Sequence, residues 1–398
     1  MSTEHTTDWA LAARDAAAKL AVDALDRDRE GAEPLAEAQL LREHRLPGLL
    51  LPVEVGGGGG TWADALRAVR EVAVADGSIA QLLGYHYVNQ ANLEWVADPT
   101  TRERWQRRAG AAQWLWGDAV NPVDPDLVLT PAADGSGAYR LSGRKSFATG
   151  VSSGDVSVVS GQDSESGRHV LVVVERSAAG VRPGGDWDNL GQRLSASGSV
   201  TFDDVEVPAE NVLGFLDGDA ATPRASLVTP AIQAVFGNFY VGVVRGALQT
   251  AAEYTRTTTR AWPYGGDDKD SATQEWYVLE GYGELATKLW ADEALLDAVG
   301  AEASAVLHAA RESLTERTRG ELAVRIAAAK VRAVDDGLEV ATRVYELTGA
   351  RASSNAVGLD VHWRNLRTHS LHDPLPYKKR EVGAFALLDE VPEPTWYT

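Results

Sequence analysis

The sequence contains no cysteine at any of its 398 positions, and its one methionine is Met1. The absence of cysteine excludes disulfides, thiolate nucleophiles, iron–sulfur clusters and cysteine-ligated zinc sites. An interior without methionine has no easily oxidised thioether, which would suit an enzyme that handles peroxides, although biased codon usage explains it at least as well. No apolar run approaches the roughly 20 residues that a membrane-spanning helix requires.

Basic residues are in the minority: 38 lysines and arginines face 57 aspartates and glutamates, and the formal net charge is -19. A surface this acidic repels nucleic-acid phosphates and anionic lipids, so we expect neither nucleic acid nor a membrane as a partner. The first residues, MSTEHTTDWALAARD, lack the basic-then-apolar pattern of a secretory signal. We therefore expect a cytoplasmic protein.

The chain does contain apolar periodicity of two kinds, in three successive parts. Residues 1–113 and 223–398 show the spacings of three and four that are typical of helices, whereas residues 114–222 contain short β-branched runs separated by Gly, Asp and Ser. We expect an α+β fold with an N-terminal helical domain, a small antiparallel, barrel-like β domain in the middle, and a C-terminal four-helix bundle. A cleft where three such parts meet is a favoured ligand site.

Glycines, candidate capping residues and long apolar runs indicate where individual helices begin and end in both helical parts. Five consecutive glycines, residues 56–60, precede Thr61, a candidate N-cap with Asp64 in the first turn. No Lys-Ser/Thr pair follows the glycines, so we predict a turn rather than a phosphate-binding loop. Long apolar-periodic runs predict three long helices in the C-terminal part, over residues 225–262, 272–314 and 317–348.

Near the C-terminus, the segment RTHSLHDPLPYKK concentrates groups that can do chemistry. His369, His372 and Asp373 lie close together and are followed by Pro374, which breaks a helix. An i, i+3 histidine pair beside an aspartate could be half of a metal site, although no cysteine and no HExxH segment is present to complete it. We expect no metal; an acid/base centre and a polar loop without function are the other interpretations.

Four further segments resemble the acyl-CoA dehydrogenase fold family, in the family's order and along nearly the whole chain. They are LPGLLLPVEVGGGGGTWADALRAVREVAVADGSIAQ, LSGRKSFATG, LGQRLSASGSVTFDDVEVPAENVLG and YTRTTTRAWPYGG. The resemblance implies the same three-part fold that the periodicity predicts. A fold does not determine a reaction, so the activity depends on the individual site residues.

The resemblance also implies a bound flavin and residues that contact it. Phe147 and Thr149 would lie at the face and edge of the flavin, and Asn121 would belong to a loop over it. Arg260 would hold the flavin phosphate, because its guanidinium fork matches phosphate oxygens. His86 would lie on a helix that lines the substrate side. Without the resemblance, each of these five is an ordinary core, turn or surface residue.

In many acyl-CoA dehydrogenases, a glutamate near the C-terminus removes the proton alpha to the thioester. Counting from Arg364, the matching position in this sequence is Asp373. An aspartate is one methylene shorter, and the following Pro374 pushes its backbone away from the α region. Both changes disturb the reach that a general base needs. A histidine pair followed by Asp-Pro resembles instead the two-component (group D) flavin-dependent monooxygenases on the same fold, the branch of the dibenzothiophene monooxygenases.

That branch implies reduced FMN, with FAD as the other possibility, delivered by a separate flavin reductase. It also implies O2, a C4a-hydroperoxyflavin, a small aromatic, heteroaromatic or natural-product substrate, and a homotetramer. His369 and His372 would protonate and then hold the peroxide, since a neutral imidazole donates through one nitrogen and accepts through the other. Asp373 would orient an imidazole, as carboxylates do for catalytic histidines. Two alternatives remain open: an acyl-CoA dehydrogenase with Asp373 as base, and a non-catalytic scaffold of the same fold.

Overall fold

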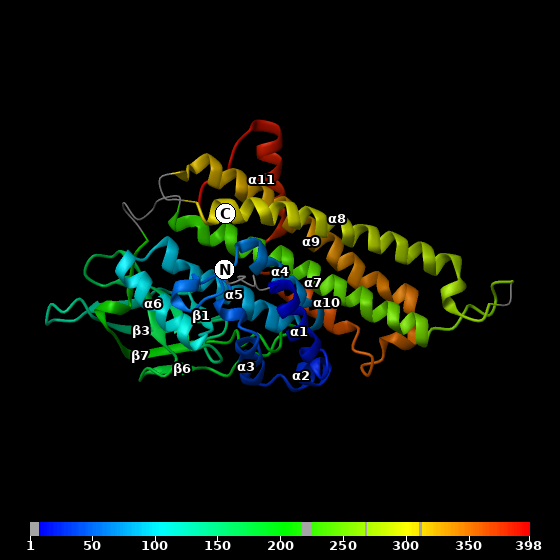
Figure 1. Cartoon of the computed structure of the whole chain (residues 1–398), viewed down its shortest axis with the longest axis horizontal. Helices are drawn as coiled ribbons and strands as arrows, with labels where there is room; N and C mark the ends of the chain where they lie inside the picture. The colour runs from blue at the N-terminus through cyan, green and yellow to red at the C-terminus, as the bar shows by residue number, and fades with distance from the viewer. Residues whose placement is uncertain (1–7, 217–223, 267–268, 310–312) are drawn as a thin grey trace, which may run out of the picture.

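A computed structural model describes residues 8–216, 224–266, 269–309 and 313–398 of the chain. Helices from the two ends of the chain pack together, and a β-sheet formed by the middle of the chain lies at one end of them (Figure 1). The predicted three-part fold is therefore confirmed. The expected boundary between residues 222 and 223 lies outside the described residues, and the boundary after residue 113 falls between the last N-terminal helix and the first strand.

Six α-helices form the N-terminal part: α1 (Trp9–Leu20), α2 (Ala24–Glu30), α3 (Leu35–Glu43), α4 (Trp62–Ala75), α5 (Gly77–Trp95) and α6 (Pro99–Ala112). Thr61 is the N-cap of α4, as its sequence predicts, and the structure adds a capping box: the Thr61 side chain accepts from the Asp64 N–H and the Asp64 carboxylate accepts from the Thr61 N–H. Helix α5 is buried along nearly its whole length. The α5 side chains therefore lie in the interior of the molecule.

The middle part is one sheet built from eight strands: β1 (Trp116–Ala119), β2 (Leu127–Pro131), β3 (Tyr139–Lys145), β4 (Val156–Asp163), β5 (His169–Glu175), β6 (Val181–Pro183), β7 (Val200–Val207) and β8 (Val212–Phe215). The strand order is β6-β7-β3-β2-β4-β5-β8, with β1 beside β4. Most pairs are antiparallel as predicted, but β4 pairs with both β1 and β2 in parallel. The sheet is therefore mixed, because chain-distant strands meet on β4 without a hairpin between them.

Helices α5 and α6 cover one face of this sheet. Val158 and Val173 share a buried cluster with Trp105 of α6, whereas the next residues along the same strands point into a second cluster inside the β domain. This alternation follows from the two-residue period of a strand. Both faces of β4 are consequently buried, and only Gln162 among its residues is exposed.

The C-terminal part contains α7 (Val228–Thr257), α8 (Trp276–Leu307), α9 (Glu316–Thr348), α10 (Asp360–His369) and α11 (Leu375–Leu388). The three long helices occur where the sequence predicts them. Helix α4 of the N-terminal part packs against α7 and α8, so a shorter helix from the other end of the chain joins the three long helices in the bundle.

Helix α7 corrects the expectation that no apolar run approaches membrane-spanning length. The stretch from Ala225 to Thr257 is long and apolar enough to cross a membrane, but 89% of its most apolar window is buried inside the protein. Helices α4, α5, α8 and α9 all pack on it. An apolar helix with this much protein cover is the central helix of the core.

Candidate active site

The predicted catalytic histidines lie in the turn that joins α10 to α11. Helix α10 ends at His369, and the His372 N–H donates to the His369 carbonyl at 3.0 Å, which closes the turn. Pro374 occupies the N-cap position of α11 with an extended backbone. The proline therefore ends one helix and begins the next, as its sequence position predicts. Both imidazoles and the Asp373 carboxylate are brought to one place.

His369 is buried among aromatic rings from two helices. Its imidazole centroid lies 4.5 Å from that of Phe236 and 5.1 Å from that of Phe239, both on α7. Tyr85 of α5 packs edge-on at 6.2 Å. These rings exclude water from the imidazole, and they come from segments more than a hundred residues away in the sequence.

The two nitrogens of His369 have different surroundings. Nδ1 lies 2.9 Å from the hydroxyl of Tyr240, whereas Nε2 is buried and has no hydrogen-bond partner among the described residues. Burial lowers the pKa of His369 well below its ordinary value, and the neighbouring His372 and Lys330 add to this shift. The imidazole is therefore neutral at neutral pH, with one nitrogen held and the other without a partner among the described residues.

His372 stacks on His369 and faces Asp373. The two imidazole rings are 5.9 Å apart and 15° from parallel, and His372 Nδ1 lies 3.6 Å from Asp373 Oδ1. Lys330 of α9 forms an ion pair with the same carboxylate oxygen, while Oδ2 of Asp373 has no partner among the described residues. Burial alone would raise the pKa of Asp373, but the contacts with His372 and Lys330 hold it well below its usual range. Asp373 is therefore a carboxylate at neutral pH.

Sequence reasoning missed Lys330. The residue lies on the buried side of α9, and Gln233 Oε1 accepts from its Nζ at 2.6 Å. Burial lowers its pKa to about 8, and the charge of Asp373 opposes that shift. The signal was present, because Lys330 occupies an apolar-periodic position four residues from both Ile326 and Val334. Only the fold shows which carboxylate it meets.

A cavity of about 670 Å³ opens beside this turn. It lies between α11 and residues 390–398, with His372 and Asp373 at its wall. The ring of Tyr397 meets that of His372 edge-on at 6.1 Å, so the C-terminal residues fold back over the turn. The turn is thus accessible to a small molecule from this side, whereas His369 is enclosed.

His86 has a different environment from the one that its predicted catalytic role requires. It is fully buried on α5, and its Nε2 donates to the Pro47 carbonyl at 2.8 Å. Its Nδ1 accepts from the N–H of Trp116 at 3.0 Å. Burial lowers the pKa of His86 to about 4. Both nitrogens are engaged with backbone, so the structure gives His86 a structural role, and its catalytic role stays a prediction.

The predicted flavin-contacting residues of the β domain lie together after β3. Phe147 adopts a left-handed backbone (φ 52°) and its side chain is 62% exposed, with Trp187 packed edge-on at 6.1 Å. Thr149 is buried, and its Oγ1 lies 2.9 Å from Ser197 Oγ, which in turn lies 2.8 Å from Ser195 Oγ. An exposed ring above a chain of buried hydroxyls suits the apolar face and polar edge of a flavin ring.

Asn121 and Arg260 lie in loops. Asn121 is in the connection between β1 and β2, where its Nδ2 donates to Ser146 Oγ at 3.3 Å and its carbonyl accepts from Lys145 Nζ at 2.9 Å. Arg260 follows the end of α7 and its side chain is exposed. An exposed guanidinium after a helix end is available to a phosphate. Neither residue is tested as a flavin ligand by these contacts, and both assignments stay predictions.

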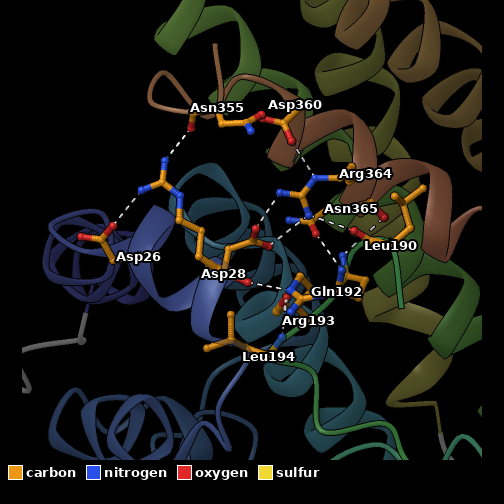
Figure 2. Close-up of polar contacts among 12 residues, drawn as sticks. Asp26, Asp28, Leu190, Gln192, Arg193, Leu194, Asn355, Asp360, Arg364 and Asn365 are labelled. Atoms are coloured by element: carbon orange, nitrogen blue, oxygen red, sulfur yellow. Dashed lines mark hydrogen bonds and ion pairs between the residues drawn. The ribbon is translucent and has the colours of Figure 1, made fainter. Parts of the chain in front are cut away.

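A polar clamp around Arg364 connects α10 to α2 and to the segment of the β domain before β7 (Figure 2). Arg364 of α10 donates to Asp28 of α2 at 2.6 Å and to the Leu190 carbonyl at 2.9 Å. The neighbouring Asn365 accepts from the N–H of Gln192 at 2.7 Å. Leu190 and Gln192 belong to the segment before β7 that also carries the hydroxyl chain. The clamp therefore fixes α10 relative to the predicted flavin contacts.

The residues described by the structure include no group of three or more His, Asp or Glu side chains arranged to hold a metal ion. The His369–His372 pair is instead surrounded by aromatic rings and by the ammonium of Lys330. A cation beside the pair would compete with that ammonium for the Asp373 carboxylate.

Comparisons with known proteins agree with the geometry. The family model for the acyl-CoA dehydrogenase N-terminal domain matches residues 3–111, and the model for the C-terminal domain matches residues 234–375. The chain is 36% identical over 388 residues to the probable FMNH2-dependent monooxygenase SfnC of Pseudomonas putida, which covers 97% of this chain and 96% of that protein. It is also 36% identical over 398 residues to the dibenzothiophene monooxygenase of Mycolicibacterium goodii, with 96% and 94% covered.

Among solved structures, the complex of TdsC from Paenibacillus sp. A11-2 with FMN and indole superposes with a TM-score of 0.93. That protein is 36% identical in sequence, and the match covers 98% of this chain and 100% of that chain. The resemblance inferred from the sequence motifs is confirmed. The chain belongs to the acyl-CoA dehydrogenase fold family, in the branch of FMNH2-dependent monooxygenases that includes dibenzothiophene monooxygenase.

Proposed function

We propose that this protein is a monooxygenase that uses reduced FMN and O2 to oxygenate a small aromatic or heteroaromatic compound. A separate flavin reductase supplies the reduced FMN. The family branch supports FMN over the FAD of the acyl-CoA dehydrogenases. The observation that carries the proposal is the neutral His369 among aromatic rings, next to an ion-paired Asp373: its Nε2 is buried and has no hydrogen-bond partner in the part of the chain that the structure describes.

The residues of the β domain and of the helix ends fit a bound flavin. Phe147 presents an exposed ring, Thr149 lies at the end of a buried hydroxyl chain, and Arg260 presents an exposed guanidinium. In this proposal Phe147 packs on the ring system, Thr149 contacts its polar edge, Arg260 holds the phosphate and Asn121 contributes from its loop. Reduced FMN supplies two electrons, so that one atom of O2 enters the product and the other leaves as water.

The histidine turn handles protons in this reaction. His369 Nε2 donates or accepts a proton at the reacting oxygen while Tyr240 holds Nδ1. The rings of Phe236 and Phe239 keep water away, which limits wasteful release of hydrogen peroxide. His372 lies at the cavity side of the same turn, oriented by Asp373. His372→Ala is expected to retain FMN binding while diverting O2 to hydrogen peroxide, and full coupling in that variant would remove its assigned role.

The structure disfavours the dehydrogenase alternative. A base that removes a carbon-bound proton needs a pKa near the working pH. The contacts with His372 and Lys330 instead hold the pKa of Asp373 well below its usual range. The carboxylate is also fixed in an ion pair with Lys330 rather than free to reach a substrate. A non-catalytic scaffold is disfavoured as well, because stability alone does not require an unpaired imidazole nitrogen in the interior.

The test is a reconstituted reaction of the purified full chain with FMN, a generic flavin reductase, a nicotinamide reductant and O2. Aromatic and heteroaromatic compounds, indole and dibenzothiophene among them, are screened for a mass increase of one oxygen atom. Oxygenation only in the presence of the reductase supports the proposal. Anaerobic reduction of bound flavin by an acyl-CoA would establish the dehydrogenase instead, and failure to bind FMN or FAD at micromolar concentrations would leave the scaffold.

The proposal includes a homotetramer in the cytoplasm, where reduced flavin is available. Large aromatic side chains are exposed along α8 and the segment before it, with Trp276 70% and Trp290 67% exposed. Exposed apolar groups of this size on a long helix are typical of subunit contacts. Light scattering of the purified protein measures the assembly, and a monomeric mass at micromolar concentration would contradict it.

A further inference from the structure

Lys330 is a buried charge at a position where the helix pattern calls for an apolar residue. The residue is 1% exposed, and its neighbours one turn away on α9, Ile326 and Val334, are buried apolar side chains. Its ammonium meets three groups: the carboxylate of Asp373, Oε1 of Gln233 at 2.6 Å, and the ring of Phe236 with its centroid at 5.2 Å. Three segments therefore converge on this one nitrogen: α7, α9 and the histidine turn.

Stability does not explain this arrangement. Replacing a buried ion pair by well-packed apolar residues is often neutral or stabilising, because the attraction only repays the loss of hydration. The three contacts do have one consequence that an apolar residue could not reproduce. They fix the Asp373 carboxylate at the point where Oδ1 lies 3.6 Å from His372 Nδ1.

The ring of Phe236 extends the same arrangement to both histidines. Its centroid lies 4.5 Å from that of His369, 4.8 Å from that of His372 and 5.2 Å from the Lys330 ammonium. A displaced Lys330 would therefore disturb the packing of the ring against the two imidazoles as well as the carboxylate. Lys330 reaches the histidines only through these neighbours.

We propose that Lys330 is a positioning residue of the monooxygenase site: it holds Asp373 as an oriented carboxylate, and Asp373 in turn holds His372 toward the reacting oxygen. This inference rests on the proposed function. Lys330 is buried and is not among the residues that line the cavity beside the turn, so it acts through Asp373, and its ion pair keeps Asp373 from acting as the base of a dehydrogenase.

The test is a double-mutant cycle with Lys330→Met, Asp373→Asn and the two combined. The readout is hydrogen peroxide released per product formed, at saturating reduced FMN and O2. Loss of a hydrogen bond to a charged group predicts that each single variant releases at least about tenfold more peroxide per product. Since Lys330 acts through Asp373, the double variant is expected to be no worse than Asp373→Asn.

Lys330→Met leaves a buried carboxylate without its cation, so this variant can fail to fold. The double variant removes both charges, so it leaves no unpaired carboxylate in the interior. Its peroxide release is compared with that of Asp373→Asn alone, and this comparison tests the inference even if Lys330→Met does not fold. Arg325→Met is the matched control, because Arg325 is a cation on the same helix whose ion pair with Glu302 is exposed. We expect Arg325→Met to release as much hydrogen peroxide per product formed as the unmodified protein does.

Two results would overturn the inference: normal coupling in Lys330→Met, or a double variant that is worse than Asp373→Asn by the full effect of the lysine substitution. Either result in an otherwise active protein removes the role of Lys330 and leaves the proposed function intact. Failure of the unmodified protein to oxygenate any compound in the screen would instead remove the proposed function.

Discussion

Two buried histidines in different regions of the molecule differ in how their ring nitrogens are hydrogen-bonded. His86 on α5 and His369 at the end of α10 are both enclosed, and burial lowers the pKa of each. Both ring nitrogens of His86 bind backbone groups, whereas one nitrogen of His369 has no partner among the residues that the structure describes. The difference teaches that a lowered pKa marks burial, and that the unpaired nitrogen is what distinguishes a candidate acid/base group.

The largest expected effect tests this distinction directly. His369→Ala should reduce product formation by about 10²- to 10⁴-fold, the usual contribution of a proton-transferring side chain. FMN affinity and the unfolding midpoint should change little by comparison. Product and hydrogen peroxide are measured together in the reconstituted reaction. A variant that keeps normal product formation would place His369 with His86 as a structural residue.

The next effect is the pH dependence of the free energy of unfolding, to which His86 should contribute strongly. Its folded pKa of about 4 lies below the ordinary value of 6.5, so the unfolded state binds more protons between these values. Stability is therefore fully present above about pH 6.5 and falls as the pH drops toward 4, by roughly 3 kcal/mol for this histidine. Urea unfolding at a series of pH values measures the loss. His86→Gln should remove the share of this histidine, whereas His362 and His369, whose pKa values burial also lowers, keep theirs. An unchanged slope would show that His86 contributes nothing to it.

An intermediate effect is expected in the clamp of Figure 2. Arg364→Gln removes the charged contact with Asp28, which is 4% exposed, and should lower the free energy of unfolding by roughly 1.5–3 kcal/mol. Because Arg364 also holds the segment with the hydroxyl chain, peroxide release should rise. Asp26→Asn, at an exposed ion pair with Arg29, is the control and should change neither quantity. Loss of stability with unchanged coupling would make the clamp purely structural.

The smallest effect should come from the partner of His369. Tyr240→Phe removes the hydroxyl that lies 2.9 Å from Nδ1 and keeps the ring. A neutral hydrogen bond contributes about 1 kcal/mol, so product formation should fall several-fold rather than a hundredfold. Steady-state kinetics of product formation measure the change. A loss as large as that of His369→Ala would show that Tyr240 transfers a proton itself.

Much of the architecture was predictable because its signals are local. Spacing of apolar residues predicted the three long helices, and the Thr61–Asp64 pair predicted the start of α4. The parallel pairing of β4 with β1 and β2 was not predictable, since strand neighbours are chosen by the tertiary fold. The apolar length of α7 was underestimated, because its polar residues are spread along a helix that the protein buries.

The candidate site also contains residues that the sequence identified and one that it did not. His369, His372 and Asp373 were identified because they are close in sequence and precede a proline that forces a turn. Lys330 was not identified, because it lies 43 positions from Asp373 on another helix. The predicted roles of Asn121, Phe147, Thr149 and Arg260 depend on a flavin and stay predictions.

The sequence by itself determined the order of helices and strands, the family, and the turn that carries the reactive groups. Each of these depends on residues a few positions apart, where backbone period and side-chain preference act directly. The tertiary structure alone decided which histidine keeps a free nitrogen and which charge faces Asp373. Those properties depend on contacts between distant segments, and burial makes them strong because water no longer competes for the same groups.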